Sequence, residues 1–297
     1  GMKNQRCNCS GYGSIICGWV GLWMAVGLVW LGGCVPPKRE PEILCPGKAN
    51  REEVIDTLRA RQAATLSLRS SVSCVMEFTD AQGKPKKESF DGTLRFVGPD
   101  RLYLGGEKFG PIRIGANPET FWMYVKPALD TAWYGPRRNV MLCPEKIGFN
   151  PFYLADALGQ IDLSLDWLLT QDPGFDVLTV IETTGLRRVY INCCTYRIER
   201  IEYCDTLGKL IASADLSDYK TITDVGDIPS TIDLRHFRGG RMNTRLTLKL
   251  SGIAVFRPTE AQMRLFVRPE PKGFEAVYQL NEFCEFVPDR EQAEGRL

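Results

Sequence analysis

The sequence predicts a mainly β (α+β) fold, built on one strongly curved antiparallel sheet with an N-terminal helix and a short helical insert in its concave face. Three observations predict it. Roughly a dozen short segments alternate apolar and polar residues with period two. One helical segment precedes them, and a short, very apolar pair of helices interrupts them near residues 150–170. A sheet of that many strands curls, and its concave apolar face must be covered by helices or by a ligand.

The N-terminal segment differs in composition from the rest of the chain. Lys3 and Arg6 are followed by a long uncharged run, in which residues 15–31 are densely apolar and which ends in Leu-Gly-Gly-Cys34. This ending resembles the lipobox that the lipoprotein signal peptidase of bacteria cleaves. The resemblance implies that residues 1–33 are a signal peptide and that Cys34 is lipidated and anchors the chain to a membrane. The alternative is an uncleaved transmembrane helix, since about 20 apolar residues can span a bilayer.

A proline-rich segment separates this signal from the folded part. Four prolines lie within residues 35–50, which are therefore extended and reach roughly 50 Å at about 3.1 Å per residue. We expect residues 34–50 to be a tether, residues 51–286 to be the folded body and residues 287–297 to be a loose tail. A lipid-anchored body on a tether would belong to the cell envelope and face the periplasm, with the outer membrane favoured.

The body begins with a helix and a long hairpin. Asn50 is a good N-cap, and apolar residues at helical spacing predict a helix over residues 51–69. The period then changes to two over residues 72–78 and 90–96, which predicts an antiparallel hairpin with one wet and one apolar face. The apolar face comprises Val72, Cys74, Met76 and Phe78 on the first strand and Phe90, Leu94 and Phe96 on the second.

Short strands and two helices follow. Residues 150–158 begin with Asn-Pro, which favours a helix start because Asn caps a helix and proline suits its first position. A second helix is predicted over residues 162–169, with Leu165, Trp167 and Leu168 on it, and both helices are so apolar that they must be covered. The strands are predicted over residues 101–104, 111–115, 119–125, 131–134, 175–183, 187–192, 196–204, 209–215, 219–223, 230–237, 242–250 and 274–280.

Residues 92–110, GTLRFVGPDRLYLGGEKFG, are followed by an aromatic strand beginning at Phe121 and by strand pairs over residues 197–215 and 229–237. This order of segments resembles the LolA/LolB superfamily of bacterial lipoprotein carriers and receptors. The resemblance implies an unclosed β-barrel, with helices in its concave face around a hydrophobic cavity for acyl chains. The chain departs from the family pattern in its extra cysteines, its longer tether and its extension after Gly252.

The resemblance and the apolar faces together predict a ligand cavity. The expected ligand is a lipid or an acylated lipoprotein, held by burial of CH₂ groups at about 0.8 kcal/mol each. The resemblance also places an exposed apolar residue before a glycine, here Phe109, which would contact the membrane or hand over the ligand; packing under a loop is the alternative. The predicted cavity residues are Met76, Phe78, Phe90, Leu94, Phe96, Trp122, Leu165, Trp167 and Leu168.

Of the eleven cysteines, seven follow Cys34, and their spacing fits no zinc site, so we predict no metal. Cys193 and Cys194 would point to opposite faces of a strand, so that one of them could bond Cys204 across a turn. Unpaired cysteines in the core are the alternative. A thiol-active protein built on Cys193 or Cys194 is a rival function, but no cluster of cations nearby would lower a thiol pKa.

Composition and missing motifs exclude several classes of function. With 37 Lys+Arg against 36 Asp+Glu, the chain has no basic footprint for nucleic acid. The sequence contains no nucleophile elbow, P-loop, dinucleotide fingerprint or zinc-protease motif, so we predict no enzyme, no catalytic residue and no cofactor. The single histidine, His236, is expected to be a core imidazole. A second candidate function is an envelope sensor or assembly lipoprotein whose concave face holds a protein segment instead of lipid.

Overall fold

The computed structural model describes residues 45–61, 67–79, 83–107, 111–126, 129–159 and 161–289. The helices are α1 (Arg51–Arg61), α2 (Arg137–Leu142), α3 (Pro151–Ala157) and α4 (Glu260–Met263), with 3₁₀ helices η1 (Pro144–Lys146) and η2 (Arg264–Phe266). The strands are β1 (Ser67–Thr79), β2 (Pro85–Val97), β3 (Arg101–Glu107), β4 (Pro111–Ala116), β5 (Thr120–Val125), β6 (Thr131–Pro136), β7 (Leu168–Asp172), β8 (Phe175–Glu182), β9 (Gly185–Asn192), β10 (Ile198–Cys204), β11 (Leu210–Ile222), β12 (Gly226–Arg238), β13 (Arg241–Val255), β14 (Ala276–Leu280) and β15 (Phe286–Pro288).

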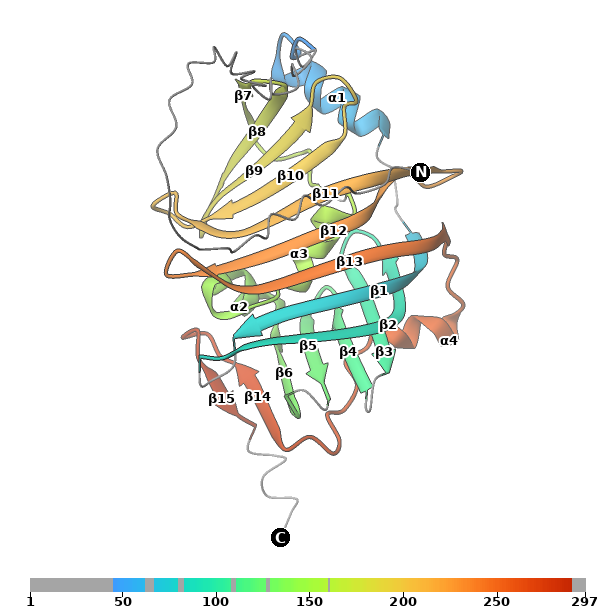
Figure 1. Cartoon of the computed structure of the whole chain (residues 1–297), viewed down its shortest axis with the longest axis vertical. Coiled ribbons are helices and arrows are strands. Elements are labelled where there is room, and N and C mark those ends of the chain that lie inside the picture. Colours follow the sequence, from blue (N-terminus) through green and yellow to red (C-terminus); the bar gives the residue numbers. More distant parts are fainter. Residues whose placement is uncertain are drawn as a thin grey trace, which may run out of the picture. The chain divides into compact units, whose positions relative to one another are not determined.

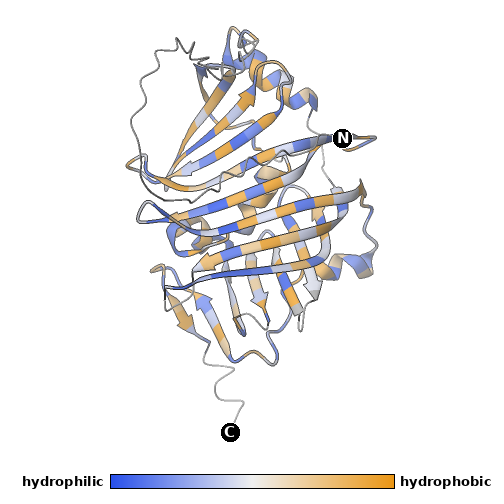
Figure 2. Ribbon diagram, in the orientation of Figure 1, coloured by the Kyte–Doolittle hydropathy of each residue, from blue (hydrophilic) through white to orange (hydrophobic). Residues whose placement is uncertain are grey.

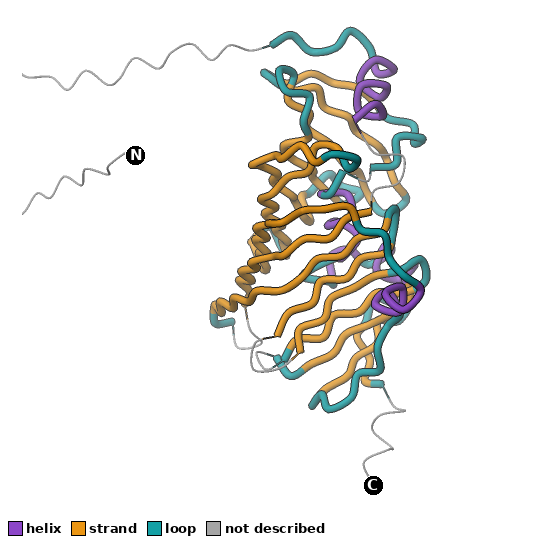
Figure 3. The backbone as a smooth tube through the Cα atoms, turned by 90° about the vertical axis from the view of Figure 1, so that its right-hand side faces the viewer, coloured by secondary structure: helices purple, strands orange, loops and turns teal. Residues whose placement is uncertain are grey.

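All of these strands belong to one sheet, in the order β15-β14-β6-β5-β4-β3-β2-β1-β13-β12-β11-β10-β9-β8-β7 (Figure 1). Neighbouring strands are antiparallel except for β14 and β6, which are parallel. The two end strands, β15 and β7, do not pair with each other, so the sheet stays open, and it curves along its length (Figure 3). The predicted fold class, a curved and unclosed antiparallel sheet with few helices, is confirmed.

The alternation predicted for the first hairpin sets which side of the sheet is apolar. Along β1, Leu68, Ser70, Val72 and Cys74 are buried, and the residues that alternate with them, Arg69, Ser71 and Ser73, are exposed. In the register of the sheet, Cys74 lies opposite Phe90 on β2 and Leu248 on β13. Apolar residues of neighbouring strands therefore line up on one face, and the banded colouring of the strands in Figure 2 follows this alternation.

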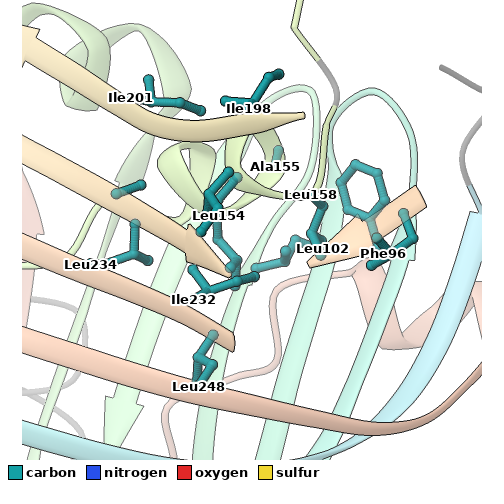
Figure 4. Close-up of a cluster of buried hydrophobic side chains, with 14 of the residues drawn as sticks. Phe96, Leu102, Leu154, Ala155, Leu158, Ile198, Ile201, Ile232, Leu234 and Leu248 are labelled. Atoms are coloured by element: carbon teal, nitrogen blue, oxygen red, sulfur yellow. The ribbon is translucent and has the colours of Figure 1, made fainter. Parts of the chain in front are cut away.

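Helix α3 covers the centre of the concave face. Its start is fixed by Asn150, whose side chain accepts a hydrogen bond from the backbone N–H of Phe152 at 3.0 Å, with proline at the first helical position. Leu154 and Leu158 are completely or almost completely buried. Figure 4 shows them among side chains from β2, β3, β10, β12 and β13. The concave face is thus filled by a helix at this point, and the predicted helix over residues 150–158 is confirmed.

The chain after β13, which we call the C-terminal segment, covers part of the face of the sheet that is opposite to the concave face. Trp122 and Tyr124 alternate on β5 with residues of the concave side and cluster with Phe274. The Tyr124 hydroxyl donates a hydrogen bond to the carbonyl of Pro269 at 2.7 Å. After this crossing the chain adds β14 beside β6. This second apolar layer was not predicted from the sequence.

An ion-pair ladder crosses the outer face of the middle strands. Asp215 on β11 lies 2.8 Å from Arg200 on β10 and 2.9 Å from Arg235 on β12. Asp233 on β12 continues the ladder to Arg245 on β13 at 2.8 Å. Opposite charges on adjacent strands favour the observed register of these strands, and they leave this face of the sheet hydrated.

Four predictions were wrong in the bounds or the type of an element. The first helix ends at Arg61, and residues 67–69, predicted as helix, belong to β1. The predicted helix over residues 162–169 is a turn followed by β7, because the Asp162 carboxylate accepts hydrogen bonds from the backbone N–H and the hydroxyl of Ser164. The strands predicted on either side of residues 216–218 are one strand, β11, and the tail predicted from residue 287 begins inside β15.

Two disulfides join distant parts of the chain. Cys45 bonds Cys194, 149 residues away, and Cys143 bonds Cys284, 141 residues away. The suggested bond to Cys204 was wrong, since Cys204 is buried and free. Cys193 and Cys194 lie in the turn between β9 and β10 rather than on a strand, so the alternation rule does not apply to them.

We predict that removing the bond at the end of α2 weakens the whole fold. The double variant Cys143→Ser/Cys284→Ser should lose about 2–4 kcal/mol of unfolding free energy, because the bond closes a long loop in the unfolded chain. Urea unfolding measures this loss, and Cys193→Ser, which alters a free cysteine, is the matched control. Equal stabilities of the double variant and the control would contradict the assigned pairing.

Candidate functional site

A pocket of about 820 Å³ lies on the concave side of the sheet, beside α3. One wall is α3 itself, another is the segment over residues 161–165, and the base comes from β9 and β10. Arg59 of α1, with Arg137 and Met141 of α2, lies at its border. The volume is in the range of sites for small molecules, about 300–1,000 Å³.

A buried polar cluster forms the base of this pocket. Arg187 on β9, which is only 8% exposed, donates to the Asp156 carboxylate of α3 at 2.8 Å and to the Glu182 carboxylate at 2.7 Å. The hydroxyl of Tyr203 on β10 donates to the same Asp156 carboxylate at 2.7 Å. Arg187, Asp156 and Tyr203 are nearly out of water, so each of them depends on its partners to offset its lost hydration, whereas Glu182 is about one third exposed.

Aromatic rings surround the cluster. The Arg187 guanidinium lies 5.4 Å from the centre of the Trp167 ring, and the rings of Tyr153 and Tyr203 stack with centres 3.7 Å apart. Burial raises the pKa of Tyr153 and that of Tyr203, so both hydroxyls stay protonated at neutral pH. Burial by itself would lower the pKa of Arg187, but the charges of its acidic neighbours outweigh burial and raise it.

Apolar side chains make up much of the upper walls of the pocket, beside polar ones such as Asp162 and Ser164. Ile161, Leu163 and Leu165 come from the turn before β7, Phe152 comes from α3, and Ile211 comes from β11. A pocket with apolar walls and a charged base has the chemistry to hold an amphiphile, with its apolar part against the walls.

The structure distributes the predicted cavity residues over four environments. Trp122 belongs to the cluster under the C-terminal segment, on the opposite face of the sheet from the pocket. Leu165 lines the pocket, while Leu168 lies on β7 and is 55% exposed. Cys34 and Phe109 lie outside the described residues. The remaining ones belong to the main core cluster or pack against it: Met76, Phe78, Phe90, Leu94, Phe96 and Trp167.

Sequence reasoning missed the polar cluster, although one signal for it exists. Along β9 the buried residues follow period two, and Arg187 occupies the same face as Val189 and Ile191. A cation at an inward-facing position needs a buried carboxylate, which marks such a site. The partner could not be found in the same way, because Asp156 is on a helix 31 residues earlier.

The cysteines and the histidine lie in environments that do not activate them. Burial raises the pKa of Cys74 to about 12, and burial together with Asp176 raises that of Cys193, whereas a reactive thiol has a lowered pKa. His236 is buried and its pKa is lowered, mainly by burial. Within the part of the chain that the structure describes, no group of three or more His, Cys, Asp or Glu side chains could hold a metal ion.

Comparisons with known proteins find similar solved structures only. No family model matches the sequence, and no curated protein matches it. The chain is similar to a putative outer membrane lipoprotein-sorting protein domain from Vibrio parahaemolyticus, with 16% identity over 72% of this chain and 94% of that one, at a TM-score of 0.47. It is also similar to the LolA superfamily protein NE2245 from Nitrosomonas europaea, with 11% identity over 74% and 99% of the two chains and a TM-score of 0.47.

In the described ranges, none of the helices is both long and apolar enough to cross a bilayer.

We predict that the buried cation Arg187, at the base of the pocket, is essential to the stability of the fold. Arg187→Met should lose about 3–5 kcal/mol of unfolding free energy, because it leaves the largely buried Asp156 carboxylate without its cation. Arg188→Met, which removes a more exposed neighbour with a 3.6 Å ion pair, should change stability by about 1 kcal/mol or less. Urea unfolding of both variants tests the contrast, and equal losses would contradict it.

Proposed function

We propose that this chain is a lipid-anchored envelope protein that binds an acyl chain of a lipid or lipoprotein in the pocket beside α3, without catalysis. One observation carries the proposal: the pocket of about 820 Å³ combines apolar walls with a charged base. Burial of an acyl chain against these walls contributes about 0.8 kcal/mol for each CH₂, so that affinity rises with chain length. Transfer or localisation of lipoproteins is the role that this binding would serve.

The predicted cavity residues take a revised part in this proposal. Leu165 would contact the ligand directly. Met76, Phe90 and Leu94 belong to the core that the helix covers, and they would meet a ligand only after α3 moved. Phe109 remains the proposed residue for membrane contact or hand-over.

Anchoring at Cys34 and an envelope location facing the periplasm, with the outer membrane favoured, belong to the same proposal. Disulfides persist in oxidising compartments, so the bonds of Cys45 and Cys143 support an extracytoplasmic location. The bond at Cys45 also shortens the proposed tether. Eleven residue steps separate Cys34 from Cys45, which is about 34 Å at about 3.1 Å per residue.

The second candidate, binding of a protein segment, is favoured by the charges of the pocket. Asp162 and Arg59 also line it, and a peptide can use such groups better than an acyl chain can. The two candidates differ in what occupies the pocket, and a direct labelling experiment separates them.

We predict that a photoactivatable fatty acid labels the full, membrane-bound chain at the pocket. Peptide mapping should find the label on residues 161–165 or on α3, with more label from a longer acyl chain. Leu165→Asp should remove most of it, because a charge in the apolar wall opposes the ligand. Leu168→Asp, three residues away and exposed on β7, is the matched control and should keep the label.

The same experiment identifies the alternative. If neither the unmodified chain nor the Leu168→Asp control is labelled, while circular dichroism shows both folded, acyl binding is wrong. A crosslinked peptide recovered at residues 161–165 in place of lipid would then support the protein-segment candidate.

We predict that Cys34→Ser abolishes incorporation of radiolabelled lipid, because the serine lacks the thiol that receives it. The variant should be released or should accumulate as precursor, as shown by fractionation and N-terminal sequencing. A variant that stays anchored with its original N-terminus would favour a transmembrane segment over a lipid anchor.

A further inference from the structure

Exposed apolar side chains gather at one rim of the sheet. We define the hairpin rim as the turns β8–β9, β10–β11 and β12–β13 with the two strand residues on either side of each turn, together with α2 and η1. Among the described residues, eight large apolar side chains are exposed, and five of them belong to this rim: Met141, Leu142, Ile181, Leu207 and Met242.

The three turns are neighbours because alternate turns of an antiparallel meander lie on the same side of the sheet. Gly185 lies so close to Cys204 that a Cβ on it would overlap the Cys204 carbonyl oxygen, and a Cβ on Gly240 would lie 4.0 Å from the Lys209 side chain. The β8–β9 turn is therefore next to the β10–β11 turn, which in turn is next to the β12–β13 turn. The turns end on one side of the ribbon in Figure 1, at its left.

Helix η1 lies against the last of these hairpins. A Cβ on Gly148, two residues beyond η1, would lie 2.8 Å from the Thr244 hydroxyl on β13. The electrostatic surroundings of His236 on β12 include the backbone of Pro144 and the charges of Glu145 and Arg238. Helix α2 directly precedes η1 in the chain, and Figure 1 shows it on the same side of the sheet as the three turns.

The rim carries an excess of unpaired cations. Every rim segment except the β8–β9 turn has an exposed basic side chain: Arg138, Lys146, Lys209, Arg238 and Arg241. Within the described residues, none of these five side chains forms an ion pair. The acidic residues of the rim are fewer. Glu182 is paired with Arg187, Asp205 accepts hydrogen bonds within its own turn, and Glu145 lies on η1.

The rim also borders the pocket. Met141 of α2, Gly185 of the β8–β9 turn and Cys204 at the end of β10 line the pocket. A surface that contacts the rim is therefore next to an opening with apolar walls. Apolar tips flanked by cations have the composition of segments that bind at the interface of an anionic membrane.

We propose that the hairpin rim docks on a lipid surface with anionic headgroups, with Leu207, Met242 and Leu142 entering the interface and the unpaired cations facing the headgroups. Docking here presents the pocket to the membrane through the side that Met141 borders. This inference goes beyond acyl binding in the pocket, because the rim can dock whether or not the pocket is filled.

Site-specific photocrosslinking tests the contact in the full chain. Benzoylphenylalanine replaces Leu207, which is 90% exposed, or Val267, which is 63% exposed and lies outside the rim, so that neither change disturbs the core. Each protein is reconstituted in vesicles of phosphatidylcholine alone or mixed with phosphatidylglycerol, with a radiolabelled trace of phospholipid. We expect lipid labelling at position 207 in the mixed vesicles, weak labelling at 267, and a decrease at 207 in phosphatidylcholine alone.

Charge reversal completes the test. Arg238→Glu/Arg241→Glu should reduce labelling at position 207 by about tenfold or more, since each cation near an anionic surface adds to the attraction, and high salt should reduce it as well. Equal labelling at 207 and 267, no effect of phosphatidylglycerol, or a crosslink from 207 to a protein in intact cells would overturn the proposal. The Leu165→Asp variant separates the two proposals. It should lose fatty-acid labelling in the pocket and keep lipid labelling at position 207, because rim docking does not require a filled pocket.

Discussion

The apolar concave face of the 15-stranded sheet must be removed from water, and the rest of the structure depends on how this is done. Leu154 and Leu158 of α3 enter the centre of that face and pack among side chains from both halves of the sheet (Figure 4). Burial of apolar surface is the main favourable free energy of folding, and here one helix of seven residues provides the central contact. The space that α3 leaves uncovered is the pocket.

The polar cluster follows from the same constraint. A helix as short as α3 has little stability of its own and needs a specific tie to stay in one place. Asp156 supplies it, because its carboxylate accepts hydrogen bonds from Arg187 on β9 and Tyr203 on β10. The ion pair that orients the helix is also the base of the pocket, so changes to the pocket and changes to stability are coupled.

The outer face of the sheet is exposed and polar in one part and covered by other parts of the chain in another. The ion-pair ladder from Arg200 to Arg245 keeps the middle strands polar, whereas the C-terminal segment covers Trp122 and Tyr124 at the other end. The bond between Cys143 and Cys284 fastens α2 to the loop after β14. The hairpin rim takes no part in these arrangements, and it carries exposed apolar side chains together with cations that form no ion pair among the described residues.

The sequence by itself determined the elements whose signals are local. Period-two alternation along β1 and β2 decides which face each residue takes, and Asn150 followed by proline decides where α3 begins, because these effects act within a few residues. The tertiary structure alone decided the pairing of Arg187 with Asp156, the partners of Cys45 and Cys143, and the cover over Trp122. The turn at Asp162 is local as well, because its carboxylate accepts hydrogen bonds from Ser164 two residues on, but the apolar spacing of residues 162–169 favours a helix there. The tertiary contacts join residues far apart in the sequence, 149 positions for Cys45 and Cys194, and only the register and curvature of the finished sheet bring them together.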